Sequence, residues 1–299
     1  LALYRAKARG KGRYEVFHQE MHAAVVERME LEADFQRALR RNEFELDYQP
    51  IFELASGRLE AVEALVRWRH PERGRMPPGD FIPVAESGRL IVPLGGWVLQ
   101  EATRQAAEWA SAYPERAPLG ICVNVSTAQL REPGLAGEVA AALESSGLPP
   151  RALCLELTET AFMEDLEAVA AVLGDLRSLG VRLAVDDFGT GYSSLQHLER
   201  FPIDLLKIAR PFVVGMEDRS ADPAIARAIV YLAKSFELGV IAEGIENAEQ
   251  VTRLVQLGCA LGQGFHLALP MGPEAIDELL AAGAGANDRD AVAHAEAHP

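Results

Sequence analysis

Two adjacent carboxylates, Asp186 and Asp187, end an apolar run and precede a loop that contains glycines. Neighbouring carboxylates repel each other unless a cation or a proton lies between them. A strand that carries paired acids into a loop is therefore a candidate metal-assisted active site. Taken alone, such a pair is more typical of a solvent-exposed turn than of a metal site. Other polar residues of the chain decide between the two interpretations.

More polar side chains stand within or directly after short apolar runs. They are Glu63, Asn124, Glu156, Glu159, Lys207 and Glu243. In a (β/α)8 barrel the C-terminal ends of the strands share one face, where active sites lie, so we expect these side chains to converge. Oxygen ligands select Mg²⁺ or Mn²⁺, and the absence of His or Cys partners disfavours zinc. An adjacent Asp pair can bridge two ions for in-line displacement at phosphorus.

Each of these residues also has an ordinary structural explanation. Glu63 could be a paired structural acid, although a buried unpaired carboxylate is costly. Asn124 alone fits a helix cap as well as a ligand. Lys207 could be an ordinary strand lysine, and Glu243 could simply precede a turn. Gln263 fits either a residue that hydrogen-bonds to the ligands or a surface polar group.

Short apolar runs alternate with longer amphipathic stretches, and this predicts an α/β fold. The runs are Phe44–Phe52, Leu59–Trp68, Leu119–Val125, Ala152–Leu157, Val181–Val185, Leu205–Ile208, Gly239–Ala242 and Ala260–Phe265. The predicted helices include Pro93–Tyr113, Leu135–Ser146, Asp165–Leu179, Pro223–Leu238 and Ala248–Leu257. About eight strands favour a TIM-like (β/α)8 barrel over an open sheet. No Gly-x-Gly-x-x-Gly follows the first strand, which weakens a dinucleotide-binding alternative.

Composition limits the classes of partner. The 299 residues are 49% hydrophobic and 24% charged, as in globular proteins, and the net charge of −15 argues against binding a nucleic-acid polymer. No apolar stretch approaches the roughly 20 residues that span a bilayer, so we expect no membrane contact from this segment. Cys122, Cys154 and Cys259 lie in apolar segments without metal-ligand spacing and fit reduced core thiols of a cytoplasmic protein. Upstream regions could attach a longer protein to a membrane.

Four segments are expected along the chain. Residues 1–17 resemble the end of another domain, and residues 18–30 a helical linker with apolar residues such as Val25 and Met29 among charges. Residues 31–284 form the main domain. Residues 285–299, rich in Ala, Gly, Asp and His, form a disordered tail.

The chain resembles the EAL domain family, the cyclic di-GMP phosphodiesterases of bacterial second-messenger signalling. The matching motifs follow the family's order and cover roughly Leu31 to Pro270. They are Tyr48-Gln49-Pro50, Glu63-Ala64-Leu65, Asn124-Val125-Ser126, Glu156-Leu157-Thr158-Glu159, Asp186-Asp187-Phe188-Gly189-Thr190-Gly191, Lys207-Ile208, Ala242-Glu243-Gly244 and Gln263-Gly264. Residues 1–17 are likewise similar to the last helix and strand of a GGDEF domain, the diguanylate cyclase module.

The resemblance implies an EAL-type barrel that hydrolyses cyclic di-GMP to linear pGpG with a two-metal centre of Mg²⁺ or Mn²⁺. The family's metal ligands match Glu63, Asn124, Glu156, Asp186, Asp187 and Glu243. The catalytic residues it implies are Lys207, Glu243 and Glu63, with Glu243 as second-metal ligand or general base and Lys207 near the attacked phosphate.

The resemblance also implies contacts around this centre. Gln49, Leu65, Arg67 and Gln263 match positions expected at the substrate. Glu159 matches the glutamate that anchors the loop from Phe188 to Ser194. Family members often pair through the helix after this loop, which here lies near Leu195 to Arg200, so a homodimer is expected.

One position departs from the family pattern. The family commonly has Lys-Ile-Asp where this chain has Lys207-Ile208-Ala209. Strand periodicity places residues 207 and 209 on one face, so a carboxylate that serves the second metal is missing. Three alternatives therefore remain: an enzyme of reduced activity, a receptor that binds cyclic di-GMP without cleaving it, and a scaffold that only dimerises. The scaffold leaves the acidic cluster unexplained.

Overall fold

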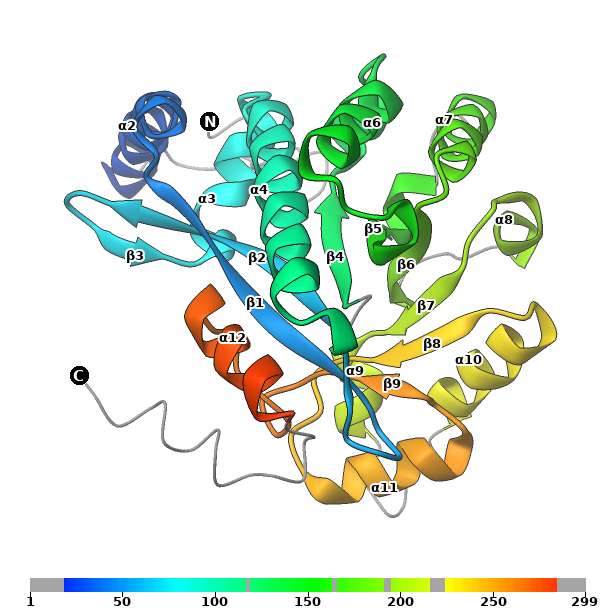
Figure 1. Ribbon diagram of the computed structural model, residues 1–299. Coiled ribbons are helices and arrows are strands. Elements are labelled where there is room, and N and C mark those ends of the chain that lie inside the picture. The colour runs from blue at the N-terminus through cyan, green and yellow to red at the C-terminus, as the bar shows by residue number, and fades with distance from the viewer. Residues whose placement is uncertain (1–18, 117–118, 163–165, 191–194, 216–223, 284–299) are drawn as a thin grey trace. The chain divides into compact units, whose positions relative to one another are not determined.

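The protein is an α/β barrel in the computed structural model, which describes residues 19–116, 119–162, 166–190, 195–215 and 224–283 (Figure 1). For residues 19–27 and 195–197 it describes the backbone alone. The strands are β1 (Phe44–Glu53), β2 (Leu59–His70), β3 (Gly74–Met76), β4 (Gly120–Val125), β5 (Leu153–Thr158), β6 (Arg182–Phe188), β7 (Leu205–Ile208), β8 (Gly239–Ala242) and β9 (Leu261–Gly262).

Eight of these strands close into a barrel. They are hydrogen-bonded in the order β1-β9-β8-β7-β6-β5-β4-β2, and β1 also pairs with β2. Strand β3 pairs only with β2, on the outer end of that strand. The TIM-like barrel expected from the alternation of strands and helices is confirmed.

The first strand departs from a regular (β/α)8 barrel because it runs antiparallel to β9, whereas the barrel pairs from β2–β4 to β8–β9 are parallel. A short turn at residues 54–58 joins β1 to β2, with the Glu53 amide donating to the Arg58 carbonyl at 2.8 Å. Gly57 has a φ of 76° in this turn, a conformation that glycine adopts without steric cost. A crossover helix is needed only between parallel strands, so none separates β1 from β2.

Helices surround the strands, and Figure 1 shows α4, α6, α7, α8, α10 and α11 around the outside of the barrel. The longer helices are α2 (Gln19–Arg41), α3 (Pro78–Ser87), α4 (Ile91–Ala112), α6 (Leu135–Ser146), α7 (Leu166–Ser178), α10 (Ala224–Ser235), α11 (Ala248–Leu257) and α12 (Pro273–Ala282). The shorter ones are α5 (Thr127–Arg131), α8 (Leu195–Arg200), α9 (Arg210–Val214) and the 3₁₀ turns η1 (Pro114–Arg116), η2 (Pro150–Ala152) and η3 (Glu159–Phe162).

Most predicted bounds agree with the structure, but the last strand is shorter than the run Ala260–Phe265. Gly264 lies directly against the backbone of Ile245, so that a Cβ atom there would come within 2.1 Å of the Ile245 nitrogen. The chain turns at this contact, which ends the strand at Gly262.

The chain divides into two compact units: Leu46–Arg67 with Val92–Pro299, and Leu1–Glu45 with Trp68–Ile91. The first contains most of the barrel. In the described part of the second, the rings of Phe35, Phe44, Trp68 and Phe81 form a buried cluster, with centroids 4.9 Å apart for Phe35 and Phe44. Complete burial of such a side chain stabilises the folded state by about 1.5–3 kcal/mol.

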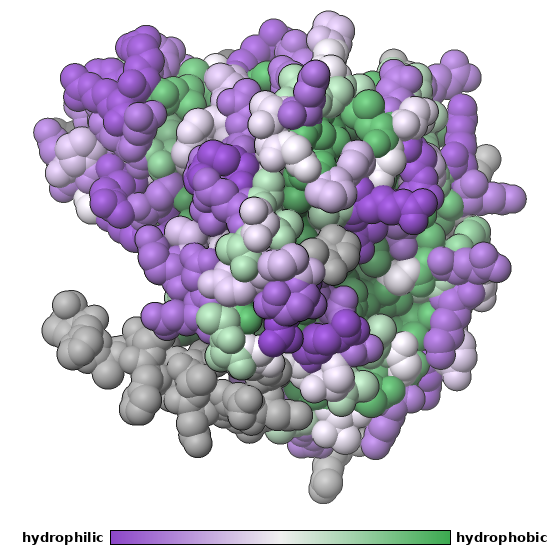
Figure 2. Space-filling view, viewed as in Figure 1, coloured by the Kyte–Doolittle hydropathy of each residue, from purple (hydrophilic) through white to green (hydrophobic). Residues whose placement is uncertain are grey.

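The expected domain boundaries remain predictions. Helix α2 runs continuously across the boundary expected at residues 30 and 31. The segment expected to be a GGDEF remnant, residues 1–17, and the expected tail, residues 285–299, lie outside the described residues. Among the described residues no helix is long and apolar enough to cross a membrane. Hydrophilic residues cover most of the face seen in Figure 2, with smaller apolar areas between them.

Candidate active site

The barrel interior is built as an apolar layer beneath a polar layer. The apolar layer is a buried cluster of one residue from each of seven strands, joined by Leu261 of the eighth: Ile51, Ala61, Cys122, Cys154, Ala184, Leu205 and Ile241. Side chains two positions apart in a strand share a face. In the parallel strands, the polar layer is therefore formed by the residue two positions after the apolar one. In β1, which runs the other way, it is formed by the residue two positions before. It consists of Gln49, Glu63, Asn124, Glu156, Asp186, Lys207, Glu243 and Gln263.

Lys207 lies at the centre of the polar layer and has no solvent exposure. Its Nζ atom is 2.6 Å from Glu156 Oε2, 2.6 Å from Glu243 Oε1 and 3.2 Å from Glu63 Oε2. Asp186 Oδ1 lies at 3.6 Å. Four of the predicted acids, carried by four strand ends far apart in the sequence, thus meet at one ammonium group.

Glu63 is held by three donors. The Nδ2 atom of Asn124 donates to its Oε1 atom at 2.8 Å, and Gln263 Nε2 donates to its Oε2 atom at 2.6 Å, beside Lys207. Gln263 also donates to Glu243 Oε1 at 3.2 Å. Gln263 therefore belongs to the buried network and is not a surface polar group. The Nδ2 contact leaves Asn124 Oδ1 as the atom that could bind a cation.

The acids of this centre differ in their affinity for protons. Burial raises the pKa of Glu243 to about 7, with further increases from Asp186 and Glu63 and a decrease from Lys207. Burial likewise raises the pKa of Glu156 well above its usual range. Burial would raise the pKa of Glu63 too, but Lys207 and the hydrogen bonds from Gln263 and Asn124 hold it below its usual value.

The surrounding carboxylates and burial have opposite effects on the pKa of Lys207. Burial would lower its pKa, but Glu156, Glu243, Glu63 and Asp186 together raise it well above its ordinary value. The ammonium group therefore stays charged. Lys207 is one positive charge among four acids, and the raised pKa values of Glu243 and Glu156 reflect this crowding together with burial.

The residues present fit a cation. Oxygen atoms of Asp186, Asp187 and Glu243 lie within 4.8 Å of one another. The Oε1 atom of Glu156 is buried without a hydrogen-bond partner in the described structure, an arrangement that is costly unless something binds it. The oxygen-only donor set suits Mg²⁺ or Mn²⁺.

Asp187 differs from Asp186 in its backbone. Its φ of 53° is in the left-handed region, which few residues other than glycine adopt, and the Asp187 amide donates to Asp186 Oδ1 at 2.9 Å. Burial and the neighbouring Asp186 raise the pKa of Asp187. The strand therefore departs from regular extended geometry at its second acid, where its pairing with β7 also shifts register.

The loop after β6 is attached to the end of β5. The backbone amide of Gly189 donates to Glu159 Oε2 at 3.1 Å. Glu159 is buried, and Gly189 has a φ of 95°. Glu159 thus contacts the loop that the sequence indicated, of which residues 191–194 lie outside the described residues.

The remaining predicted substrate residues are Gln49 of the polar layer and two residues of β2, Leu65 and Arg67. Leu65 and Arg67 follow Glu63 on the inward-facing positions of β2, and Gln49 donates to the Ala268 carbonyl at 3.3 Å. Arg67 Nε pairs with Asp47 Oδ2 at 2.9 Å, and only 5% of the Asp47 side chain is exposed. The sequence analysis missed Asp47. The alternation of Asp47, Gln49 and Ile51 along β1 is the signal that could have identified it.

Two further positions bear on the site. Ala209, where the expected Asp is missing, is completely buried and directly follows β7. Phe265, two residues after Gln263, exposes 69% of its surface, and the sequence analysis missed it as well. An exposed aromatic ring this close in sequence to a residue of the polar layer is a candidate for stacking on a planar ligand.

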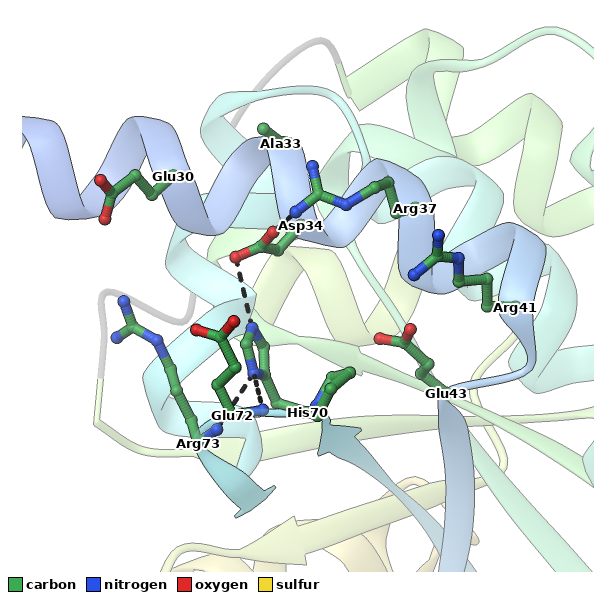
Figure 3. Close-up of a pocket in the computed structure, with 10 residues that line it drawn as sticks. Glu30, Ala33, Asp34, Arg37, Arg41, Glu43, His70, Glu72 and Arg73 are labelled. Atoms are coloured by element: carbon green, nitrogen blue, oxygen red, sulfur yellow. Dashed lines mark hydrogen bonds and ion pairs between the residues drawn. The ribbon is translucent and has the colours of Figure 1, made fainter.

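A cavity of about 480 Å³ lies elsewhere, between α2 and the turn after β2 (Figure 3). His70 lines it, with Nδ1 accepting from the amides of Glu72 and Arg73 and Nε2 3.3 Å from Asp34 Oδ2. Both ring nitrogens are therefore engaged, as expected for a structural histidine. None of the predicted site residues lines this cavity.

Comparison with known proteins places these features in context. The model of the EAL domain matches residues 32–270. The bifunctional diguanylate cyclase/cyclic di-GMP phosphodiesterase MucR of Pseudomonas aeruginosa is 42% identical over 275 residues, which are 92% of this chain and 40% of MucR. The cyclic di-GMP phosphodiesterase NbdA of the same organism is 40% identical over 282 residues, 94% of this chain and 36% of NbdA.

A solved structure, the PaMucR phosphodiesterase in complex with c-di-GMP, is 42% identical with a TM-score of 0.79, covering 83% of this chain and 99% of that one. The chain spans less than half of the length of the curated relatives.

Proposed function

The chain belongs to the EAL domain family, and on this basis we propose that it hydrolyses cyclic di-GMP to linear pGpG. The observation that carries the proposal is the meeting of Glu63, Glu156, Asp186 and Glu243 at the Nζ atom of Lys207. Relatives named as cyclic di-GMP phosphodiesterases support the substrate.

We infer that the polar layer holds two divalent cations, Mg²⁺ or Mn²⁺. The residues that would bind them are Glu63, Asn124, Glu156, Asp186, Asp187 and Glu243. Bound ions of this kind supply an activated water and neutralise charge on the attacked phosphate.

The protein's own groups would do the rest of the chemistry. The Lys207 ammonium, kept charged by its acidic neighbours, would stabilise negative charge on the phosphate oxygens as water adds and the 3′-oxygen leaves. Glu243, whose Oε1 atom lies 2.6 Å from Lys207 Nζ, would accept the proton that the attacking water loses. Glu63, fixed by three donors, would hold these groups in position.

Substrate binding is assigned to residues around the polar layer. Gln49, Leu65, Arg67 and Gln263 would contact the dinucleotide, and the exposed ring of Phe265 would stack on a guanine. Phe265→Ala should raise the KM and leave the kcat within about twofold, since stacking contributes about 1–3 kcal/mol to binding a base.

The second candidate function is a receptor that binds cyclic di-GMP without cleaving it. Ala209 favours it, because the missing carboxylate would weaken the second cation site. Asp187 and Glu243 still lie close enough to Asp186 to share a cation, so the enzyme is preferred.

The test is direct. The protein is incubated with cyclic di-GMP and Mg²⁺ or Mn²⁺, and pGpG is sought by chromatography, with Glu63→Gln as the inactive control. Formation of pGpG by the wild type but not by Glu63→Gln supports the proposal that the chain is an enzyme. Binding without product would overturn it in favour of the receptor, and absence of binding would overturn both.

The proposal extends to the protein's surroundings. We infer a homodimer through α8, testable by sedimentation velocity over a range of concentrations. A GGDEF-type domain upstream of residue 18 is supported by the name of MucR, which includes diguanylate cyclase. A cytoplasmic location is supported by three buried thiols, Cys122, Cys154 and Cys259.

A further inference from the structure

The turn after β4 is held by a capping box, a set of reciprocal hydrogen bonds between Ser126 and Gln129 at the start of α5. The Gln129 amide donates to Ser126 Oγ at 3.2 Å, and the Ser126 amide donates to Gln129 Oε1 at 3.1 Å. Ser126 Oγ also donates to the same Oε1 atom at 3.1 Å. A capping box satisfies two backbone donors at once, so it holds the backbone where the chain enters the helix. The backbone held here lies two residues after Asn124 of the polar layer.

Gln129 is buried and contacts a second helix. Only 4% of its surface is exposed. A Cβ atom at Gly95 of α4 would overlap the side-chain amide group of Gln129. Glycine within a helix costs about 0.5–1 kcal/mol relative to alanine, so Gly95 weakens α4 but gives Gln129 the room that it needs. The side chain that holds the turn after β4 is therefore itself held against α4.

Asn124 depends on such support because its own side chain has few contacts. It is exposed, whereas the other residues of β4 are buried. Among the described residues its side chain makes a single hydrogen bond, from Nδ2 to Glu63 Oε1 at 2.8 Å. The direction of Asn124 Oδ1, the atom that could bind a cation, is therefore set by this bond and by the backbone at the end of β4.

We propose that Gln129 is a positioning residue that holds Asn124 in the orientation in which Oδ1 binds a divalent cation. Glu63 fixes the side chain of Asn124, and Gln129 fixes the backbone that follows it. The inference rests on the proposed function, from which it takes Asn124 as a cation ligand. A purely structural role of Gln129 would change the free energy of unfolding and leave the affinity for the cation unchanged.

The test measures Mn²⁺ binding without any nucleotide, from the electron paramagnetic resonance signal of free Mn²⁺. KCl at about 0.15 M screens weak binding to surface acids. We expect Gln129→Ala to weaken Mn²⁺ binding about tenfold, because groups that orient metal ligands typically change the affinity about 10- to 100-fold. Gln129→Glu keeps an oxygen acceptor for Ser126 and forms the same capping box, so it should retain the affinity.

A double-mutant cycle tests whether Gln129 acts through Asn124. Asn124→Ala removes the ligand, and Gln129→Ala is then combined with it. Effects of coupled residues do not add. Gln129→Ala should therefore weaken Mn²⁺ binding in the wild type and have no further effect in the Asn124→Ala background. Additive losses would contradict a positioning role.

Two further variants separate positioning from folding. Gly95→Ala displaces the Gln129 side chain from α4 and raises the helix propensity of α4 itself. It should also weaken Mn²⁺ binding, and it provides the test if Gln129→Ala does not fold. Ser146→Ala is the control, because Ser146 Oγ donates to the Ala142 carbonyl at 2.8 Å at the end of α6, before β5 begins. Its loss should leave Mn²⁺ binding unchanged, since the polar layer lies towards the other ends of the strands. Urea unfolding reports the stability of each variant.

The outcomes distinguish the inference from the proposed function. Unchanged Mn²⁺ binding in folded Gln129→Ala or Gly95→Ala would overturn the inference and leave the proposed function standing. A loss in Gln129→Glu or Ser146→Ala as large as that in Gln129→Ala would do the same. Failure of the wild type to bind Mn²⁺ would overturn the proposed cation site and the inference with it. Weaker binding in Gln129→Ala that disappears in the Asn124→Ala background supports both.

Discussion

Lys207 is a single positive charge that four carboxylates share. Glu156 and Glu243 lie at 2.6 Å, and the other acids lie further away. Its type and place in a strand were visible in the sequence. Its contacts were not, because they depend on which strands become neighbours in the closed barrel. The ion pair of Asp47 was hidden for the same reason, since its partner is Arg67 of another strand.

Restoring the missing acid at residue 209 should strengthen cation binding. Ile208 of β7 is opposite Ala242 of β8, so residue 209 comes next to Glu243. For Ala209→Asp we expect the Mn²⁺ concentration that gives half-maximal activity to fall about tenfold, an effect of the size seen when groups around a metal are changed. Steady-state rates over a titration of Mn²⁺ measure this.

Ala209→Asn is the matched control. Residue 209 is the N-cap of α9 and has no side-chain hydrogen bond there. Asn caps a helix as well as Asp does, but it adds no charge. An equal effect of Asn and Asp would show that capping, and not cation binding, is responsible.

Glu243 should make the stability of the metal-free protein depend on pH. Its pKa rises from 4.5 to about 7 on folding, so the folded state binds the extra proton between these values. The free energy of unfolding therefore decreases as pH rises from about 4.5 to about 7, by up to about 3 kcal/mol. Glu243→Gln should match the wild type near pH 5 and exceed its stability near pH 8. Urea unfolding in EDTA measures the difference.

Glu246→Gln serves as the control for this prediction. Glu246 follows in the same loop, but it is exposed and pairs with Arg210. Its replacement should leave the pH dependence as in the wild type. If Glu243→Gln retained the full decrease between the two pH values, the buried acid could not be its cause.

At the scale of elements, the alternation of short apolar runs with longer amphipathic stretches made most of the barrel predictable. Runs such as Leu205–Ile208 and helices such as Ala248–Leu257 have the predicted bounds. The direction of β1 was not predicted, because an apolar run has the same pattern in either direction. The short Gly57 turn after β1 is the local signal for a hairpin. The early end of β9 depends on the contact of Gly264 with Ile245, which no local pattern reveals.

The loop after β6 depends on the end of β5 for its position. Glu159→Ala removes the acceptor of the Gly189 amide, and a hydrogen bond to a charged group contributes about 1.5–3 kcal/mol. We expect kcat/KM to fall about 10- to 100-fold, which is this energy expressed as a rate. Hydrogen exchange at Gly189 should become faster in the same variant.

Glu159→Gln keeps an oxygen acceptor at that position and should retain most of the activity. A loss as large as that of Glu159→Ala would indicate that the charge of Glu159, and not its hydrogen bond to Gly189, matters. Unchanged activity in both variants would contradict a role for this contact.

At the scale of the whole molecule, the net charge of −15 opposes an anionic substrate. Long-range repulsion weakens as salt shortens the Debye length from about 30 Å at 0.01 M to about 8 Å at 0.15 M. At saturating metal, kcat/KM should therefore increase with KCl over this range, opposite to the behaviour of a basic enzyme. Steady-state rates at several KCl concentrations test this. A decrease with salt would show that local cations dominate association.

The two layers of the barrel interior have opposite effects on the folded state. The apolar layer stabilises it, whereas the polar layer concentrates buried acids whose raised pKa values, such as that of Glu243, mark an energetic cost. Loss of an acid with a raised pKa, such as Glu243, should therefore stabilise the metal-free fold, whereas loss of Glu63, whose pKa is lowered, should not. Ala209 shows the same balance at the next position along the chain from β7, because a completely buried methyl group there adds no acid to those already crowded around Lys207.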